Sequence, residues 1–206
     1  TEKVPLVPVG RDMGTVFIEE DPWSTRPQGK MVITMPSIPG VDTYSVGIPV
    51  PDLSTSDVMG RLTVDTEAGS VTVPSNMLTG VSGISGNKAV IAIGQGDKEN
   101  LPDEVKTVIG DRPLISINLS VDGKKINWGN PNATVTVSIP YTPTAEELAN
   151  PESIVIWYID GSGNVVSVPN GRYDSAAGAV TFTTTHLSDF AVAYNPVDFY
   201  DVSEDV

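Results

Sequence analysis

The residues best suited to chemistry in this sequence are an imidazole and a hydroxyl, one residue apart. His186 is the only histidine in the chain, and it stands two residues before Ser188. An imidazole near neutral pH can take a proton from a serine hydroxyl and so make that hydroxyl a nucleophile. A hydrolase triad would add a distant carboxylate, which a sequence alone does not locate. Taken alone, the pair therefore fits either a nucleophilic site or an ordinary turn at a strand end.

Other kinds of active site find little support in the composition. The chain has no cysteine, which excludes disulfides, thiolate catalysis and cysteine-type zinc sites. Residues 160–164 (Asp-Gly-Ser-Gly-Asn) are similar to part of a calcium loop, but the later carboxylates are missing. A hairpin turn explains this segment fully. We therefore expect no metal ion and no cofactor.

The charge balance argues against several classes of partner. The formal net charge is −14, from 26 acidic and 12 basic residues. Nucleic acids and anionic membrane surfaces both attract proteins through Lys and Arg, so neither is an expected partner. No apolar run reaches the length of a transmembrane helix, so we expect no membrane span.

The sequence around the His–Ser pair indicates short strands separated by turns. The 19 glycines and 17 prolines recur at short intervals, which disfavours long helices. Residues 114–121 alternate cleanly, and Ile115, Ile117, Leu119 and Val121 share one face. Further strands are predicted at 61–65, 70–73, 88–93, 135–139, 154–160, 164–168, 179–185 and 189–194.

These strands predict an all-β fold. We expect a β-sandwich, or two packed antiparallel sheets with Greek-key-like connections. A few short helical turns accompany them, at 54–59, 75–78 and 144–149. In the last of these, Thr144 and Glu147 have the spacing of a capping box. The apolar segment 154–160 is predicted to be buried on both faces.

Residues 186–192 (His-Leu-Ser-Asp-Phe-Ala-Val) resemble the cleavage motif of the GAIN domains of adhesion receptors. They are also similar to the His-Phe-Ser motif of self-cleaving ZU5 domains. In those families the triplet lies at a tight turn between two strands, and the bond before the Ser or Thr is cut. The resemblance implies that His186 is the general base, Ser188 the nucleophile and Leu187 the donor of the scissile carbonyl.

The chemistry that this resemblance implies is an acyl shift followed by hydrolysis. The Ser188 hydroxyl attacks the carbonyl of Leu187 through a five-membered ring, and water then hydrolyses the resulting ester. Strain at the turn, on the order of a few kcal/mol, must favour the ester over the amide. The receptor motif is framed by disulfide-bonded cysteines, which this chain lacks, so packing alone must hold the turn.

A longer resemblance covers residues 44–206, to modules that precede S-layer homology (SLH) repeats in bacterial surface proteins. Segments 69–74, 135–141 and 173–186 carry it, and residues 199–206 resemble the opening of an SLH repeat. The resemblance implies a secreted protein of a bacterial cell surface or S-layer. Its partners would be the upstream and downstream modules of the same protein and, through SLH repeats, a cell-wall polymer.

We expect the chain to divide into three parts, because residues 1–28 show no regular pattern beyond the short apolar stretch 15–18. Residues 1–28 are expected to be an N-terminal extension or the tail of a preceding module. Residues 29–196 would form the GAIN/ZU5-like β domain. Residues 197–206 would be a linker and the start of a truncated SLH repeat.

Two alternatives to self-cleavage stay open. In the first, the module is a non-catalytic spacer beside a wall anchor, and His-Leu-Ser is only a strand turn. In the second, exposed aromatic residues bind carbohydrate. Of the three tryptophans, Trp157 is predicted to pack in the core, whereas Trp128 and Trp23 are candidates for a sugar platform.

Overall fold

The computed structural model describes residues 7–8, 13–18, 29–56 and 59–196, and within them it contains two β-sheets. Eight strands of the larger sheet follow one another in the order β1 (Val7–Pro8), β2 (Met13–Phe17), β4 (Thr43–Pro49), β7 (Lys88–Gln95), β8 (Leu114–Val121), β15 (Asp189–Tyr194), β11 (Ile154–Ile159) and β12 (Val165–Val168). A further short strand, β9 (Lys124–Ile126), pairs with the end of β8. The smaller sheet has the order β13 (Arg172–Asp174), β14 (Ala179–Thr184), β10 (Val135–Pro140), β6 (Gly69–Pro74), β5 (Arg61–Thr66) and β3 (Lys30–Thr34).

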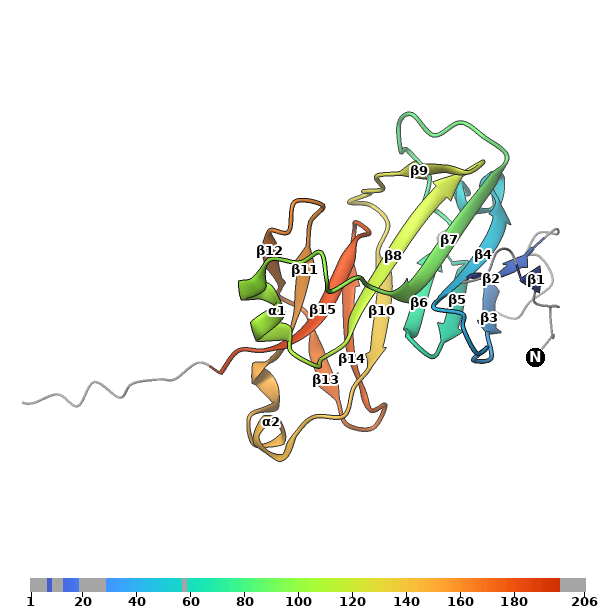
Figure 1. Cartoon of the computed structure of the whole chain (residues 1–206). Helices are drawn as coiled ribbons and strands as arrows, with labels where there is room; N and C mark the ends of the chain where they lie inside the picture. Colours follow the sequence, from blue (N-terminus) through green and yellow to red (C-terminus); the bar gives the residue numbers. More distant parts are fainter. Residues whose placement is uncertain (1–6, 9–12, 19–28, 57–58, 197–206) are drawn as a thin grey trace, which may run out of the picture.

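The two sheets form a β-sandwich-like fold, which confirms the predicted fold class (Figure 1). Strand β8 shows why the pattern is readable, because Ile115, Ile117, Leu119 and Val121 are all buried in the core between the sheets. The facing strands β10 and β14 bring Val135, Val137 and Ile139 and the ring of Phe182 to the same core. Apolar residues at every second position of a strand must share a face.

The sheets differ from the expected antiparallel pairing at one place each. In the larger sheet β2 runs parallel to β4, and in the smaller sheet β3 runs parallel to β5. Both sheets are therefore mixed. Residues 13–17 lie within the segment expected to be an extension, yet they pair with β4. Residues 197–206, expected to be a linker and the start of an SLH repeat, lie outside the described residues.

A short helix that the sequence did not predict covers the outer face of the larger sheet. Helix α1 (Asp103–Ile109) inserts Val105 and Ile109 into a second apolar cluster, together with Ile159 and Ala191 from the sheet. Strand β11 thus has apolar contacts on both faces, but Val155, Trp157 and Tyr158 are only half-buried, so the predicted burial is confirmed in part. No helix of the described residues is long and apolar enough to cross a membrane.

The other helical turns agree with the sequence only in part. Helix α2 (Ala145–Ala149) begins with the predicted capping box between Thr144 and Glu147. Residues 75–78 lie in a turn and 54–56 outside any helix, while 57–58 are outside the described residues. The described residues also include the 3-10 helices η2 (Val50–Leu53) and η3 (Pro151–Ser153).

The buried carboxylate of Glu147 links α2 to the loop that precedes β8. The Glu147 side chain is almost fully buried and accepts hydrogen bonds from Arg112, from the Tyr141 hydroxyl at 2.7 Å and from the Thr144 amide at 2.8 Å. Burial raises the pKa of Glu147, but the hydrogen bonds and the charge of Arg112 outweigh it and leave the pKa below its ordinary value. Burial and the contact with Glu147 raise the pKa of Tyr141 to about 12.

Candidate functional site

The His-Leu-Ser triplet lies in the four-residue connection that leads from β14 in one sheet to β15 in the other (Figure 1). Backbone hydrogen bonds hold both ends of this connection. The Asn130 amide donates to the carbonyl of Thr185 at 2.9 Å, and the Ile117 amide donates to the carbonyl of Ser188 at 2.9 Å. His186 also forms an isolated antiparallel bridge with Gly129. The connection is therefore held at one end by the segment 129–130 and at the other by β8.

The segment beside the connection is held from within the core. Trp128 is only 1% exposed, and its indole N–H donates to the carbonyl of Met77 at 2.9 Å. The prediction that Trp128 is an exposed aromatic is therefore wrong, because an apolar ring with its one donor satisfied is stable in the interior. Trp157 packs against the second cluster as predicted, and Trp23 lies outside the described residues.

The imidazole of His186 packs against an aromatic ring from β11. The ring centroids of His186 and Tyr158 are 4.3 Å apart in an edge-to-face arrangement. Nδ1 of His186 lies 3.4 Å from Oγ1 of Thr184, and that hydroxyl donates to the His186 carbonyl at 2.9 Å. Tyr158 and Thr184 thus fix the direction of the imidazole, and nothing in the local sequence of the motif indicated their roles.

The hydroxyl of Ser188 makes a different contact. It donates a hydrogen bond to the carbonyl of Ile159, on the neighbouring strand β11, at 2.9 Å. Ser188 lines a slot of about 630 Å³ whose wall includes Asn118, Lys125 and Asp189. Both β9 and β15 pair with β8, β9 near one end of that strand and β15 near the other. The slot lies between β9 and β15. Because the slot is open, water can reach the region around Ser188.

The imidazole and the hydroxyl therefore share one turn but face different hollows. His186 lines a separate hollow of about 350 Å³, and Tyr158 contributes to the walls of both. None of the hydrogen bonds of the described residues joins His186 to Ser188. General-base catalysis by His186 thus requires a change of rotamer at one or both residues.

The peptide unit between Leu187 and Ser188 differs from its neighbours in its hydrogen bonding. The carbonyls of Thr185, His186 and Ser188 each accept a hydrogen bond from the protein. Within the described part of the chain, no hydrogen bond is made by the Leu187 carbonyl or by the Ser188 amide. The Leu187 side chain is buried in the core. The unit is therefore anchored on both sides while its own polar atoms are unengaged.

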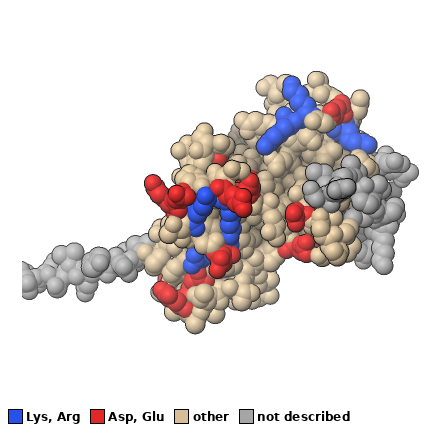
Figure 2. Space-filling model, in the orientation of Figure 1, with Lys and Arg blue, Asp and Glu red and all other residues tan. Residues whose placement is uncertain are grey.

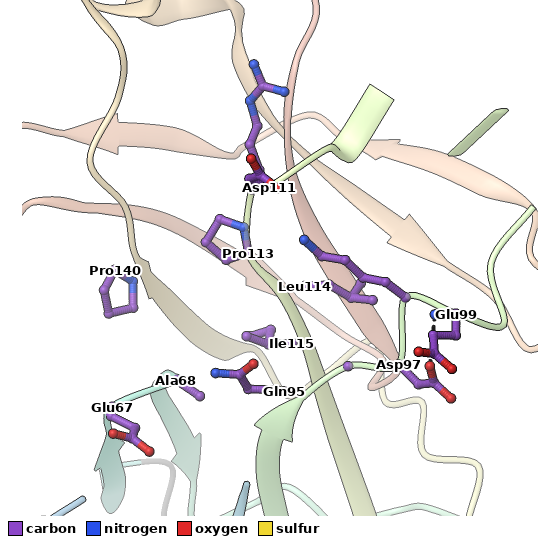
Figure 3. A pocket seen from close by; sticks show the side chains of 13 residues that line it. Glu67, Ala68, Gln95, Asp97, Glu99, Asp111, Pro113, Leu114, Ile115 and Pro140 are labelled. Atoms are coloured by element: carbon purple, nitrogen blue, oxygen red, sulfur yellow. Dashed lines mark hydrogen bonds between the residues drawn. The ribbon is translucent and has the colours of Figure 1, made fainter. Parts of the chain in front are cut away.

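A second hollow contains several acidic side chains and includes none of the residues of this turn. It has a volume of about 600 Å³ and is lined by the carboxylates of Glu67, Asp97, Glu99 and Asp111 (Figure 3). Asp97 accepts hydrogen bonds from the Glu99 amide and the Asn100 side chain, and in Figure 3 Glu67 lies on the opposite side from Asp97. No two of these carboxylates are positioned to act together on one substrate, so we assign no catalytic site to this hollow.

Among the residues that the structure describes, no group of three or more His, Cys, Asp or Glu side chains is arranged to hold a metal ion. Asp160 accepts hydrogen bonds from the Asn164 side chain and from the amides of Asn164 and Ser162, and these lower its pKa. Its carboxylate thus closes the turn between β11 and β12. Segment 160–164 is a hairpin turn, as predicted.

Comparison with known proteins adds no relative. The sequence matches no family model, and neither a curated protein nor a solved structure matches it. The proposal below therefore rests on the residues and geometry of the chain and on the motif resemblances described above.

Proposed function

We propose that this chain is a module of a bacterial cell-surface protein that cuts itself between Leu187 and Ser188. The observation that supports cleavage most is the state of that peptide unit. Its carbonyl and amide are unengaged, while the flanking carbonyls of His186 and Ser188 are held by Thr184 and by Ile117. Because the backbone is held on each side, distortion can concentrate in the peptide unit between Leu187 and Ser188, which no hydrogen bond from the described residues stabilises.

The reaction needs only groups of this turn and water. The Ser188 hydroxyl leaves the Ile159 carbonyl, attacks the carbonyl carbon of Leu187 and transfers its proton to His186. The C–N bond breaks, the nitrogen takes a proton from the imidazolium, and an ester joins Leu187 to the Ser188 oxygen. Water from the slot then hydrolyses this ester. The products are a Leu187 carboxylate and a free amine at Ser188, and His186 returns to its starting state.

Cleavage would leave the two fragments associated. Strand β15 begins at Asp189 and lies inside the larger sheet, paired with β11 along its whole length and with β8 over its first three residues. Its side chains Phe190 and Val192 are fully buried in the core. Neither the strand ladder nor this packing depends on the bond that is cut.

The location and partners in this proposal follow from the resemblance of residues 44–206 to modules that precede SLH repeats. The module would then be secreted to the cell surface or S-layer. It would be joined to further modules of the same protein and held to a cell-wall polymer by SLH repeats. A cut before β15 would place a break in the covalent chain between the upstream modules and this anchor.

A second candidate function is that of a non-catalytic spacer in the same surface protein. The contact that favours it is the hydrogen bond from the Ser188 hydroxyl to the Ile159 carbonyl. That bond gives Ser188 a structural role, and the packing of His186 on Tyr158 does the same for the imidazole. In this function the triplet only forms the connection between the sheets.

The denatured intact mass of the purified chain separates these two functions. Self-cleavage is expected to give two species whose masses sum to that of the chain plus one water, the smaller beginning at Ser188. N-terminal sequencing of the small species identifies the bond. A single species of 21.8 kDa that persists through long incubation would instead exclude self-cleavage and leave the spacer.

A further inference from the structure

The hollow lined by His186 lacks charged side chains, which are present in three other hollows of the described residues. The slot beside Ser188 contains Lys125, Asp160 and Asp189, and the hollow of Figure 3 contains four carboxylates. A further hollow near Gly161 contains Asp97 as well as Asp160 and Asp189. In Figure 2 the charged side chains of the visible face lie over α1 and α2, around β9 and in a smaller acidic group between these two places. The hollow at His186 has no Lys, Arg, Asp or Glu in its lining.

The lining of this hollow contains hydroxyl groups and no charged side chains. Thr134, Ser167, Thr183 and Thr185 all line it, from the segment before β10, from β12 and from the end of β14. None of these four side chains is engaged in a hydrogen bond with another residue that the structure describes. Elsewhere in the sheets comparable hydroxyls pair with each other, as Thr63 does with Thr72 at 2.7 Å. The hollow therefore offers unengaged hydroxyl groups from three separate segments.

The wall that carries these hydroxyls is held in place. The side chain of Asn170 bonds the backbone of Thr183 twice, accepting from its amide at 2.7 Å and donating to its carbonyl at 3.0 Å. This pair ties the loop after β12 to β14. The floor includes the rings of Tyr158 and His186, which pack edge to face. Groups held in this way lose little entropy when a ligand binds.

From these features we infer that the hollow at His186 is a binding site for one ring of a neutral saccharide. A sugar ring presents hydroxyls that exchange hydrogen bonds with serine and threonine, and it has C–H faces that pack on aromatic rings. The volume of about 350 Å³ lies at the lower end of the range for small-molecule sites. This site is distinct from the tryptophan platform considered above, and it does not depend on cleavage.

Other classes of ligand fit the hollow less well. A phosphate or a carboxylate would find no Lys or Arg among the lining residues, and a cation would find no carboxylate. A purely aliphatic ligand would cover four hydroxyls without giving them partners, which carries a desolvation penalty. An uncharged ligand with several hydroxyls and a C–H face can pair with the lining hydroxyls and also cover the apolar side chains Val166, Val168 and Pro169.

The test is a titration of the full chain, labelled with ¹⁵N, with glucose, galactose, mannose and N-acetylglucosamine, followed by amide chemical shifts. We expect at least one of these probes to shift the amides of residues 166–168, 170 and 183–186 in a saturable way. Glucuronate serves as the charged comparison, and its shifts are expected to be much smaller.

A matched pair of variants locates the site. Val166 on edge strand β12 lines the hollow and is 56% exposed, while Val32 on edge strand β3 is 52% exposed and does not line it. Val166→Glu is expected to abolish the saturable shifts, and Val32→Glu to leave them unchanged. Shifts that survive in Val166→Glu, or the absence of saturable shifts up to the solubility limit of all four probes, would overturn the inference. Both titrations can also be carried out with Ser188→Ala in the background, where no cleavage is expected. The result for saccharide binding therefore does not depend on the result for cleavage.

Discussion

Ser188→Ala is expected to abolish cleavage completely and to leave a single species in the denatured intact mass. The reason is chemical, because no other hydroxyl can reach the Leu187 carbonyl through a five-membered ring. The variant also loses the hydrogen bond to the Ile159 carbonyl, which costs about 1 kcal/mol of folding free energy. The fold should therefore persist, as circular dichroism and thermal unfolding can verify.

Two companion variants make this result specific. Ser188→Cys keeps a nucleophile at the same position and is expected to retain cleavage through a thioester. Ser162→Ala removes a hydroxyl from the same slot and is expected to cleave like the parent chain. If Ser188→Ala still gives two fragments, the cut comes from an outside protease and self-cleavage is wrong.

His186→Ala tests the base separately from the nucleophile. General-base assistance contributes on the order of 10²–10⁴-fold to such reactions, so the rate of cleavage should fall by that order. Imidazole added to the buffer is expected to restore part of the rate, because the vacated hollow is open to solvent. A purely structural role for His186 would show no such rescue.

Glu147→Ala is expected to give the largest loss of stability among single substitutions outside the apolar core. It would leave Arg112 without its buried partner and would free the Tyr141 hydroxyl and the Thr144 amide. Removing one partner of a buried ion pair costs about 3–5 kcal/mol. The Arg112 side chain is 24% exposed, so water compensates in part and we expect about 3 kcal/mol. Urea unfolding measures this difference.

The neighbouring residue and the pH provide the controls for this result. Glu146→Ala, on the exposed side of α2, is expected to change the free energy of unfolding by less than about 0.5 kcal/mol. The pKa of Glu147 is lower in the folded state, so its contribution is complete at neutral pH and is lost as the pH falls through the folded-state pKa. Parent and Glu147→Ala should therefore converge in stability at strongly acidic pH. An equal difference at both pH values would show that the carboxylate charge is irrelevant.

The strands could be predicted from the sequence because their signals are local. Leu114–Val121 and Asp189–Tyr194 begin and end where the sequence indicates. The parallel pairs were not predictable, because which strands become neighbours depends on contacts between distant segments. Helix α1 was missed because it has only seven residues, too few for the spacing of Val105 and Ile109 to stand out.

The candidate site, like the fold, could be predicted from the sequence only in part. The turn that contains His186, Leu187 and Ser188 follows from the two strands that flank it. The directions of the imidazole and the hydroxyl do not, because Tyr158 and Ile159 on β11 set them from about thirty positions upstream in the chain. Burial of Trp128 likewise depends on the Met77 carbonyl, 51 residues away.

The position of β15 has a mechanical consequence. All six of its residues pair with β11, and three of them also pair with β8. The hydrogen bonds of such ladders run perpendicular to the strands, so tension applied along β15 loads them in shear and all together. An edge strand such as β12, pulled away from its single neighbour, would instead peel off one bond at a time. Cut or uncut, the module therefore transmits tension at this point through a shear joint.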